Sequence, residues 1–350
     1  MSFITLIIVI SILVFVHEFG HFIVAKKSGV RVDEFSIGFP PRVWSFKRGE
    51  TTYSLNLIPF GGYVKIFGEN PDEDSLHGPD SGRSFVNKSR GVQAAILVAG
   101  VAMNILFAFA LLSASFMIGV SSPAENGSVS NTVLVSEVLP NSPAEKAGLK
   151  QNDLILSTSA EKIESDIAAS GGKPVVFSYE RAGVIATTSI IAKAGVVKDK
   201  LAIGIAMVNV QDLKLSFFPA IVEGAKATGD IFVSTALGLK DFLFSVFSFR
   251  ADLSQVSGPV GIAGYLNQAR QFGLSALLSL IALISINLAV INLLPFPALD
   301  GGRLLFVAIE SIIRRPLNPK IANTLNLIGF ALLLLLMVTI TFSDIAKLVK

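Results

Sequence analysis

The chain is poor in cysteine and in charge. None of its 350 residues is a cysteine, so neither a disulfide framework nor a thiol nucleophile is available. Charged residues make up 16% of the chain, against about 25% in an ordinary globular domain. Apolar residues make up 51% and are gathered in blocks. Such a chain would be hard to keep soluble, so we predict a membrane protein with one or more polar domains.

The small excess of positive charge does not indicate a nucleic-acid partner. The formal net charge is +3, and the Lys and Arg residues are scattered beside apolar blocks rather than clustered on an aromatic-rich face. Charges that flank membrane spans explain this distribution. We therefore predict that the chain contacts the lipid bilayer and does not bind nucleic acid.

Four apolar stretches are long enough to cross a bilayer, which takes about 20 residues. They cover residues 3–25, 91–120, 272–294 and 323–342. The first stretch has no basic n-region and no small-residue cleavage site, so we expect a retained helix rather than a signal peptide. The pattern predicts a polytopic α-helical membrane protein with four transmembrane helices.

Basic residues predict the orientation of these helices. Ten Lys and Arg residues lie between positions 26 and 90, and four lie between positions 303 and 320. Loops rich in Lys and Arg remain on the cytoplasmic side. Both loops should therefore be cytoplasmic, and residues 121–270 and both termini should lie outside.

Residues 127–212 differ in character, because short β-type runs alternate there with Gly, Pro and Asn turns. We expect strands at 132–138, 153–157, 174–180 and 184–191, and a short helix at 142–147 that ends at Gly148. This pattern predicts a small inserted α+β domain. Residues 213–270 follow, where charges interrupt the apolar positions too often for a span and instead suit an interfacial amphipathic helix.

The predicted order of segments follows from these patterns. A first transmembrane helix at 1–26 precedes a membrane-associated β region at 27–90, a second helix at 91–120, the inserted domain at 127–212 and the interfacial region at 213–270. A third span with a following helix at 271–315 and a fourth span at 321–342 complete the chain.

Two of the three histidines occur in the run HEFGH at residues 17–21. Residues four apart share one face of a helix, so His17 and His21 can reach the same metal ion. Glu18 projects about 100° away, close enough to hold a metal-bound water rather than the metal. The alternative is a set of polar residues facing solvent near a helix end. Ionisable groups inside an apolar helix are costly and usually functional, which favours a metal site.

A catalytic zinc usually has three protein ligands, so a third ligand is needed. Asp300 is the one acidic residue between Asp252 and Glu310. It follows the run NLLPFPAL at residues 292–299, whose two prolines break the preceding helix. We expect Gly301 and Gly302 to form a tight turn into a helix at 303–315. The alternative role for Asp300 is an N-cap of that helix.

Four separated motifs carry a resemblance that covers essentially the whole chain. They are HEFGH at 17–21, IPFGGYVK at 58–65, SGPVGI at 257–262 and NLLPFPALDGG at 292–302. In this order they resemble the site-2 protease family of intramembrane metalloproteases, notably its bacterial RseP/RasP-type branch. Three positions depart from the family pattern: Pro40 replaces a frequent glycine, Val101 a frequent proline and Arg303 a common histidine.

The resemblance implies a set of site residues. His17, His21 and Asp300 would bind Zn²⁺, and Glu18 would be the general base. Asn292, with Asn287 as a second candidate, would steady the oxyanion or the substrate backbone. The protein would be located in the inner (cytoplasmic) membrane of a bacterial cell. Its inserted domain would lie on the external or periplasmic side and its active site toward the cytoplasm.

The stretch 51–65 predicts a membrane-associated β-hairpin. Apolar and polar residues alternate from Thr52 to Leu57, and Gly61-Gly62 suits a turn. The family resemblance implies a sheet whose edge pairs with an unwound substrate. The corresponding substrate-binding candidates are Tyr53, Ser54, Leu55, Asn56, Gly61 and Gly62. The alternative is a plain cytoplasmic hairpin.

The inserted domain resembles a PDZ domain, because the run VSEVLPNSPAEKAGL at 135–149 matches a segment common in bacterial PDZ modules. Ile203 and Gly204 would then lie in the loop and strand that bind a peptide C-terminus. In the family, such domains are thought to select substrates already trimmed outside the membrane. A spacer without a ligand is the alternative.

The function that follows is a zinc-dependent intramembrane endopeptidase. Its partners would be single-span transmembrane protein substrates, such as anti-sigma factors or remnant signal peptides. Two other classes remain open. One is a catalytically inactive membrane scaffold with a PDZ domain. The other is an HtpX-type membrane metallopeptidase, whose third ligand would be a glutamate such as Glu310.

Overall fold

The computed structural model describes residues 2–123, 132–157, 159–181, 184–197, 200–248, 256–315 and 317–349. The chain divides into two units. The first comprises Met1–Ser113, Ile221–Gln268 and Leu278–Lys350, and the second comprises Ala114–Ala220 and Ala269–Leu277. The expected start of the inserted domain at residue 127 lies outside the described residues.

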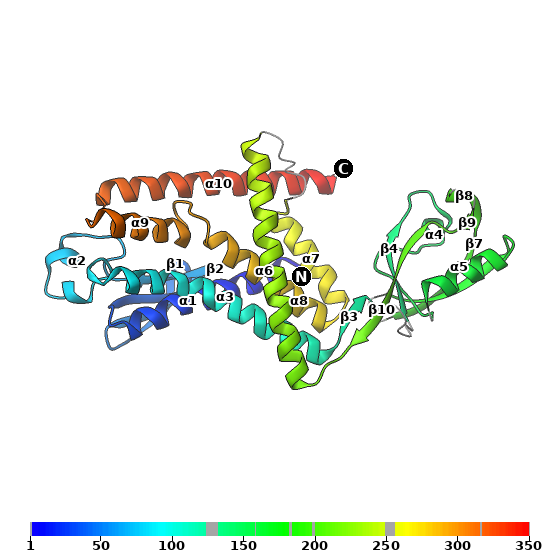
Figure 1. Ribbon diagram of the computed structural model, residues 1–350, viewed down its shortest axis with the longest axis horizontal. Helices are drawn as coiled ribbons and strands as arrows, with labels where there is room; N and C mark the ends of the chain where they lie inside the picture. The colour runs from blue at the N-terminus through cyan, green and yellow to red at the C-terminus, as the bar shows by residue number, and fades with distance from the viewer. Residues whose placement is uncertain are drawn as a thin grey trace. The chain divides into compact units, whose positions relative to one another are not determined.

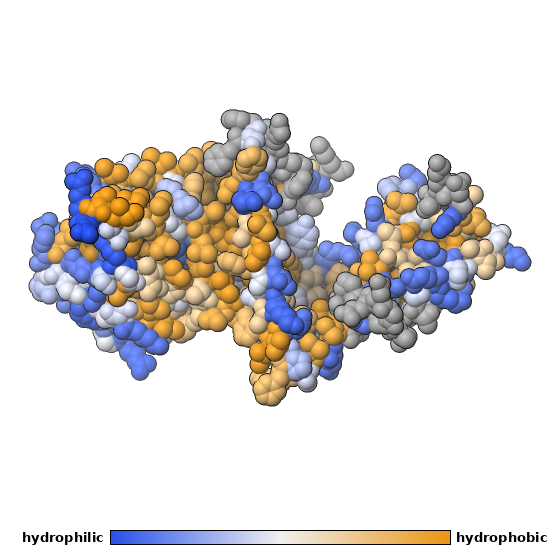
Figure 2. Space-filling view, in the orientation of Figure 1, coloured by the Kyte–Doolittle hydropathy of each residue, from blue (hydrophilic) through white to orange (hydrophobic). Residues whose placement is uncertain are grey.

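Four helices are long and apolar enough to cross a membrane: α1 (Ser2–Lys27), α3 (Arg90–Ile118), α8 (Leu274–Asn292) and α10 (Pro319–Val349). Their apolar side chains suit lipid, and a helix satisfies every backbone amide internally where water is absent. α10 leaves most of its apolar residues exposed, including Leu335 at 64% and Phe342 at 74%. Figure 2 shows apolar surface spread across the helices of the first unit. The predicted fold class, with four membrane helices and an inserted β-containing domain, is confirmed.

Besides the short helix α2 (Glu73–His77) and two 3-10 turns, three longer helices belong largely to the first unit: α6 (Phe217–Phe247), α7 (Pro259–Gln271) and α9 (Asp300–Ile313). α6 crosses the neighbouring helices in Figure 1, and its residues Ala227 and Ile231 pack against a buried cluster formed by α3 and α8. At the start of α7, the Gly261 amide donates to buried Asp344 of α10 at 2.8 Å. The predicted interfacial region therefore contains two helices, while its residues 249–255 lie outside the described chain.

The β region folds as two long strands, β1 (Val32–Arg48) and β2 (Thr51–Ile66), each bent in the middle. Phe35 pairs with both Tyr53 and Val64, so the first half of β1 lies between the two halves of β2. The second half of β1, at 42–48, pairs with the other side of 51–56. The resulting sheet has four strand segments, and its outer segments are 42–48 and 62–66. The sheet is larger than the hairpin predicted from residues 51–65.

A bend in each strand requires glycine. Gly38 has φ +83° and Gly61 has φ +111°, which L side chains rarely adopt. At Gly62, glycine is required for lack of space rather than for its backbone angles. A Cβ there would lie 2.4 Å from the Ser36 carbonyl oxygen of the neighbouring strand. The predicted Gly61-Gly62 turn is thus a bend inside one continuous strand.

The second unit contains a six-stranded antiparallel sheet in the order β3-β10-β4-β5-β6-β7. Its strands are β3 (Val120–Pro123), β4 (Thr132–Val138), β5 (Leu154–Ile155), β6 (Pro174–Arg181), β7 (Val184–Ile191) and β10 (Ile205–Leu213). Helices α4 (Pro143–Lys146) and α5 (Ala160–Ala169) and a small β8–β9 ladder (Lys193–Val197 with Lys200–Ala202) complete it. One core with Val133, Ile163 and Phe177 joins the helices to the sheet.

Candidate metal centre

His17 and His21 come from one face of α1 and lie against α3. Both side chains are buried, and their Nε2 atoms are 3.2 Å apart. A close crossing of the two helices makes this possible, because a Cβ at Gly20 would lie 2.4 Å from the Ala99 carbonyl oxygen. A Cβ at Gly100 would lie 2.3 Å from His21 Nε2. Two glycines therefore let α3 approach the imidazole rings.

Asp300 reaches the same place from a distant part of the sequence. Its Oδ2 atom lies 3.0 Å from His17 Nε2 and 3.3 Å from His21 Nε2. α8 ends at Asn292, and the following segment with its two prolines leads directly into α9, whose first residue is Asp300. The N-cap of α9 is Leu299, and no side chain caps that helix. The alternative role of Asp300 as an N-cap is therefore wrong.

Gly301 and Gly302 do not form the predicted turn, because both belong to the first turn of α9. Their role is close approach of backbone segments. A Cβ at Gly301 would lie 2.3 Å from the Leu294 carbonyl oxygen, and one at Gly302 would lie 2.1 Å from that of Phe296. The two glycines thus allow α9 to fold tightly onto the broken end of α8, which fixes the position of Asp300.

The three side chains fit a tetrahedral metal ion. His17, His21 and Asp300 each offer one ligand atom, and these atoms lie within 3.0–3.3 Å of one another. Zinc with bonds of about 2.0–2.2 Å places neighbouring ligand atoms about 3.3 Å or slightly more apart. Three electronegative atoms so close together repel one another unless a proton or a cation lies between them. The donor set and its spacing therefore suit a divalent ion.

The orientation of the His21 ring is fixed by the protein backbone. Its Nδ1 atom lies 2.7 Å from the Ile96 carbonyl oxygen of α3. A carbonyl can only accept, so Nδ1 carries the proton and the lone pair of Nε2 points toward Asp300 and His17. The ring is thus prepared to act as a metal ligand through Nε2.

Glu18 lies beside the ligands and contacts the sheet. Its Oε2 atom accepts a hydrogen bond of 2.9 Å from the Val64 amide. Val64 belongs to the outer segment 62–66, so this N–H points out of the sheet rather than to a neighbouring strand. The arrangement brings a carboxylate and a free strand edge together next to the three metal-binding candidates.

The other predicted residues of α8 do not join this cluster. Asn287 and Asn292 are half-buried on α8. Within the described part of the chain, no hydrogen bond connects either side chain to His17, Glu18 or Asp300. Glu310 pairs with Arg90 at 2.6 Å, so it is not the third ligand that an HtpX-type site would need.

The four candidates at 53–56 lie inside the sheet. Their strand segment pairs with 34–37 on one side and 42–46 on the other, so the free edge near the site is 62–66 instead. Asn56 is buried and donates to Ser36 Oγ at 2.7 Å. Ser54 donates to Glu34 at 2.6 Å. Burial acts to raise the pKa of Glu34, but hydrogen bonds from Ser54 and Arg42 outweigh it and hold that pKa below its ordinary value.

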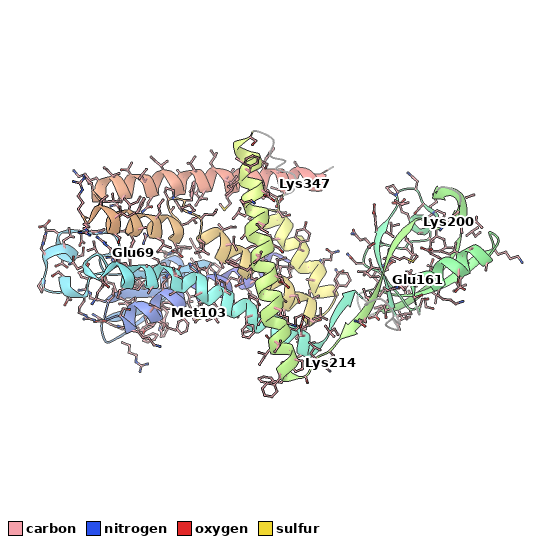
Figure 3. The ribbon with its side chains drawn as sticks, in the orientation of Figure 1. Glu69, Met103, Glu161, Lys200, Lys214 and Lys347 are labelled. Atoms are coloured by element: carbon pink, nitrogen blue, oxygen red, sulfur yellow. The ribbon has the colours of Figure 1, made fainter. Side chains whose placement is uncertain are left out.

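In the second unit, Ile203 and Gly204 line a groove of about 670 Å³ beside α5. The Ile203 carbonyl accepts from the Ala144 amide and the Gly204 carbonyl from the Leu139 amide, both at 2.9 Å. Glu161 on α5 and Lys200 on β9, both labelled in Figure 3, also line the groove.

Two parts of the metal centre had no predicted role from sequence. Gly100 contacts the rings, and Asn104 lies one turn further along α3, fully buried beside His17. A buried amide in an otherwise apolar span is a signal that sequence alone offers, but it does not identify the partner. Arg303, which departs from the family pattern, forms an ion pair with Glu69.

Comparison with known proteins places these features in context. A profile of peptidase family M50 matches residues 5–336. A Clostridium perfringens protein is 36% identical over 344 residues, covering 96% of both chains. The zinc metalloproteases RasP of Shouchella clausii and Geobacillus kaustophilus are each 30% identical, covering 98–99% of this chain and 98% of the relative.

Proposed function

The chain belongs to peptidase family M50, and from this premise we propose that it is a zinc-dependent intramembrane endopeptidase. Its substrates are single-span membrane proteins, cut in or near their transmembrane segments. The observation that carries the proposal is the convergence of His17, His21 and Asp300 within 3.3 Å, with Glu18 beside them. The named zinc metalloproteases among its relatives support zinc as the metal.

The roles of the residues follow from their chemistry. His17, His21 and Asp300 hold the zinc ion, which supplies Lewis acidity and makes water a nucleophile at neutral pH. Glu18 takes the proton of the attacking water and returns it to the leaving amine. The Val64 amide holds Glu18 Oε2 in place for this transfer. Asn292, with Asn287 as the second candidate, donates to the developing oxyanion or to the substrate backbone.

A transmembrane substrate must unwind before its peptide bond can be attacked, because helix formation occupies every backbone amide. The unwound segment then needs new hydrogen-bond partners. We assign this role to the free edge at 62–66, which lies next to Glu18. An extended substrate added to this edge would present its backbone to the metal centre. Tyr53–Asn56 support that edge from within the sheet, and Gly61 and Gly62 shape it.

The inserted domain selects substrates in this proposal. Its groove beside α5 is lined by Ile203 and Gly204, and we assign to these two residues the binding of the terminal carboxylate of an extended peptide. We place the domain on the external side of the inner membrane of a bacterial cell, and the metal centre toward the cytoplasm, because the basic residues gather at 26–90 and 303–320. Substrates of the anti-sigma-factor or remnant-signal-peptide type fit this arrangement.

The test uses purified protein in lipid vesicles, a single-span model substrate and two substitutions. Glu18→Gln should keep stoichiometric zinc and lose cleavage about 10²–10⁴-fold, the contribution of a general base. Asp300→Asn should weaken both zinc binding and cleavage, since it replaces a charged ligand by a neutral amide. The matched control is Asp241→Asn, because Asp241 is 75% exposed on α6 and pairs only with neighbouring Lys240 among described residues.

The outcomes separate enzyme from scaffold. Cleavage that survives Glu18→Gln would end the assignment of the reaction to this site. Wild-type protein that binds zinc but cleaves no single-span substrate would favour a membrane scaffold whose metal site serves stability alone.

A further inference from the structure

The two ring nitrogens of His17 face different surroundings. Nε2 points toward Asp300 and His21, at 3.0 and 3.2 Å. Nδ1 lies 3.2 Å from the side-chain amide of Asn104 on α3, one residue beyond Met103, which is labelled in Figure 3. Asn104 is fully buried in an apolar helix. Nδ1 of His21 contacts a backbone carbonyl, whereas Nδ1 of His17 contacts a side chain, which a substitution can change.

The amide of Asn104 has two useful orientations. With Nδ2 toward the ring, Nδ1 of His17 accepts and the ring proton resides on Nε2, where it can donate to Asp300. With Oδ1 toward the ring, Nδ1 donates and the Nε2 lone pair points at the ligand cluster. Only the second orientation leaves both imidazoles ready to bind a metal ion.

A metal ion on Nε2 of His17 favours a change from the first orientation to the second. In the first orientation, Oδ1 of Asn104 is buried and has no hydrogen-bond partner among the described residues. An unpaired buried acceptor is unfavourable. A metal on Nε2 puts the ring proton of His17 on Nδ1, and rotation of the amide gives that N–H the acceptor Oδ1, while Nδ2 takes the place that Oδ1 held.

A third helix holds Asn104 at this depth. Ser285 of α8, also fully buried, donates through Oγ to the Asn104 backbone carbonyl at 2.8 Å. α8 leads to the segment that carries Asp300. A chain of contacts from α8 through Asn104 to His17 therefore links the two halves of the metal centre away from the metal itself.

We propose that Asn104 is a positioning residue for zinc: its amide holds the His17 ring with Nε2 toward the metal and rotates to accept from Nδ1–H when zinc is bound. The inference rests on the proposed zinc site. Partners of this kind typically change metal affinity 10–100-fold when removed. A merely structural amide would instead stabilise the contact between α1 and α3 without regard to which atom faces the ring.

The test compares substitutions that keep or remove an acceptor, all in Glu18→Gln protein so that proteolysis plays no part. Asn104→Asp keeps an oxygen that accepts from Nδ1–H, whereas Asn104→Leu has nearly the same shape and no acceptor. Zinc affinity, measured by competition with a chelator, should fall about 10–100-fold in Asn104→Leu and stay within about threefold of the parent in Asn104→Asp. The visible spectrum of the Co²⁺-loaded protein should shift in the Leu variant alone.

The control is Ser113→Ala, a buried polar residue on the same helix that packs against Gly224 and not against the histidines. It should keep the parent zinc affinity. If Asn104→Leu does not fold, Asn104→Ala carries the same expectation, because it also lacks a side-chain acceptor. Equal zinc affinity in the Leu variant and the parent, or equal losses in the Leu and Asp variants, would overturn the inference. Absence of zinc binding by the parent protein would instead overturn the proposed function.

Discussion

Gly100 is the position on α3 that lies against both histidines of the metal centre. A Cβ there would lie 2.3 Å from His21 Nε2 and 2.7 Å from His17 Cε1. The rings cannot simply retreat, because His21 is held by the Ile96 carbonyl on the same helix. We predict that Gly100→Ala lowers the rate of substrate cleavage about 10²-fold, the typical cost of a misplacement of about 1 Å. Zinc content per protein and cleavage rate measure the effect.

Gly91→Ala is the matched control, because it makes the same chemical change on the same helix where no atom lies within 4 Å of the added Cβ. It should leave zinc content and cleavage unchanged. A Gly100→Ala protein with full zinc and wild-type cleavage would show that the rings are not confined as described.

At this scale, the sequence could predict residues whose partner is local. The spacing of His17 and His21 alone predicts that they share a helix face. Asp300 was predicted as the third ligand because no other acidic residue lies near the double-proline break. Gly100, Asn104 and Val64 could not be found this way. Each acquires its role only when α3 or the sheet packs against α1, and no spacing rule connects residues so far apart.

The strand segment at 62–66 is the element on which substrate binding depends in our proposal. Proline has no amide hydrogen and is tolerated at a sheet edge. Val64→Pro therefore removes both the donor to Glu18 and one pairing position, while the sheet remains. We predict full zinc binding with cleavage reduced about 10²-fold or more, the scale of a misplaced general base.

Val43→Pro serves as the comparison, because Val43 is 62% exposed in the opposite outer segment, 42–48. The same change of residue at that edge should leave both zinc binding and cleavage intact. Equal losses at the two edges would mean that proline harms the sheet as a whole and would remove the support for substrate pairing at 62–66.

The elements show why local patterns predict strands better than sheets. Alternation of apolar and polar residues correctly predicted strand structure at 51–57. It did not predict that each strand bends and supplies two segments of the sheet. That arrangement depends on long-range pairing: Phe35 pairs with Tyr53 on one side and with Val64 on the other, and these come from different halves of β2. The same limit applies to Gly301 and Gly302, where glycine was expected for a turn and is required for close backbone approach.

At the scale of the whole molecule, the inserted domain was predicted from a change in composition. Strands were expected at 132–138 and 184–191, and β4 and β7 confirm them. The strand expected after the loop at Ile203 and Gly204 is β10, which extends to Leu213. α5 was not expected, although the side chain of Ser159 caps its first turn. β10 pairs with β3, and Leu213 lies opposite Val120, so the domain begins and ends on neighbouring strands.

This pairing makes the domain removable as one piece. Deleting residues 120–213 and joining Gly119 to Lys214 removes the whole six-stranded sheet, while His17, His21 and Asp300 belong to the other unit. We predict that the shortened protein keeps full zinc and cleaves a substrate with a short external segment at about the wild-type rate. We expect the intact protein to cleave a substrate with a long external segment slowly, and the shortened protein to cleave it nearly as fast as the short one.

The deletion does not distinguish peptide binding from exclusion by size, but substitutions in and beside the groove do. Ala168→Trp adds a large side chain inside the groove, whereas Ala169→Trp adds it to the next residue of α5, which does not line the groove. If the groove binds a trimmed peptide end, only Ala168→Trp should slow cleavage of trimmed substrates. If size alone decides, neither should change the rate. A shortened protein that still rejects long substrates would contradict both forms of selection, since discrimination would then arise in the membrane helices.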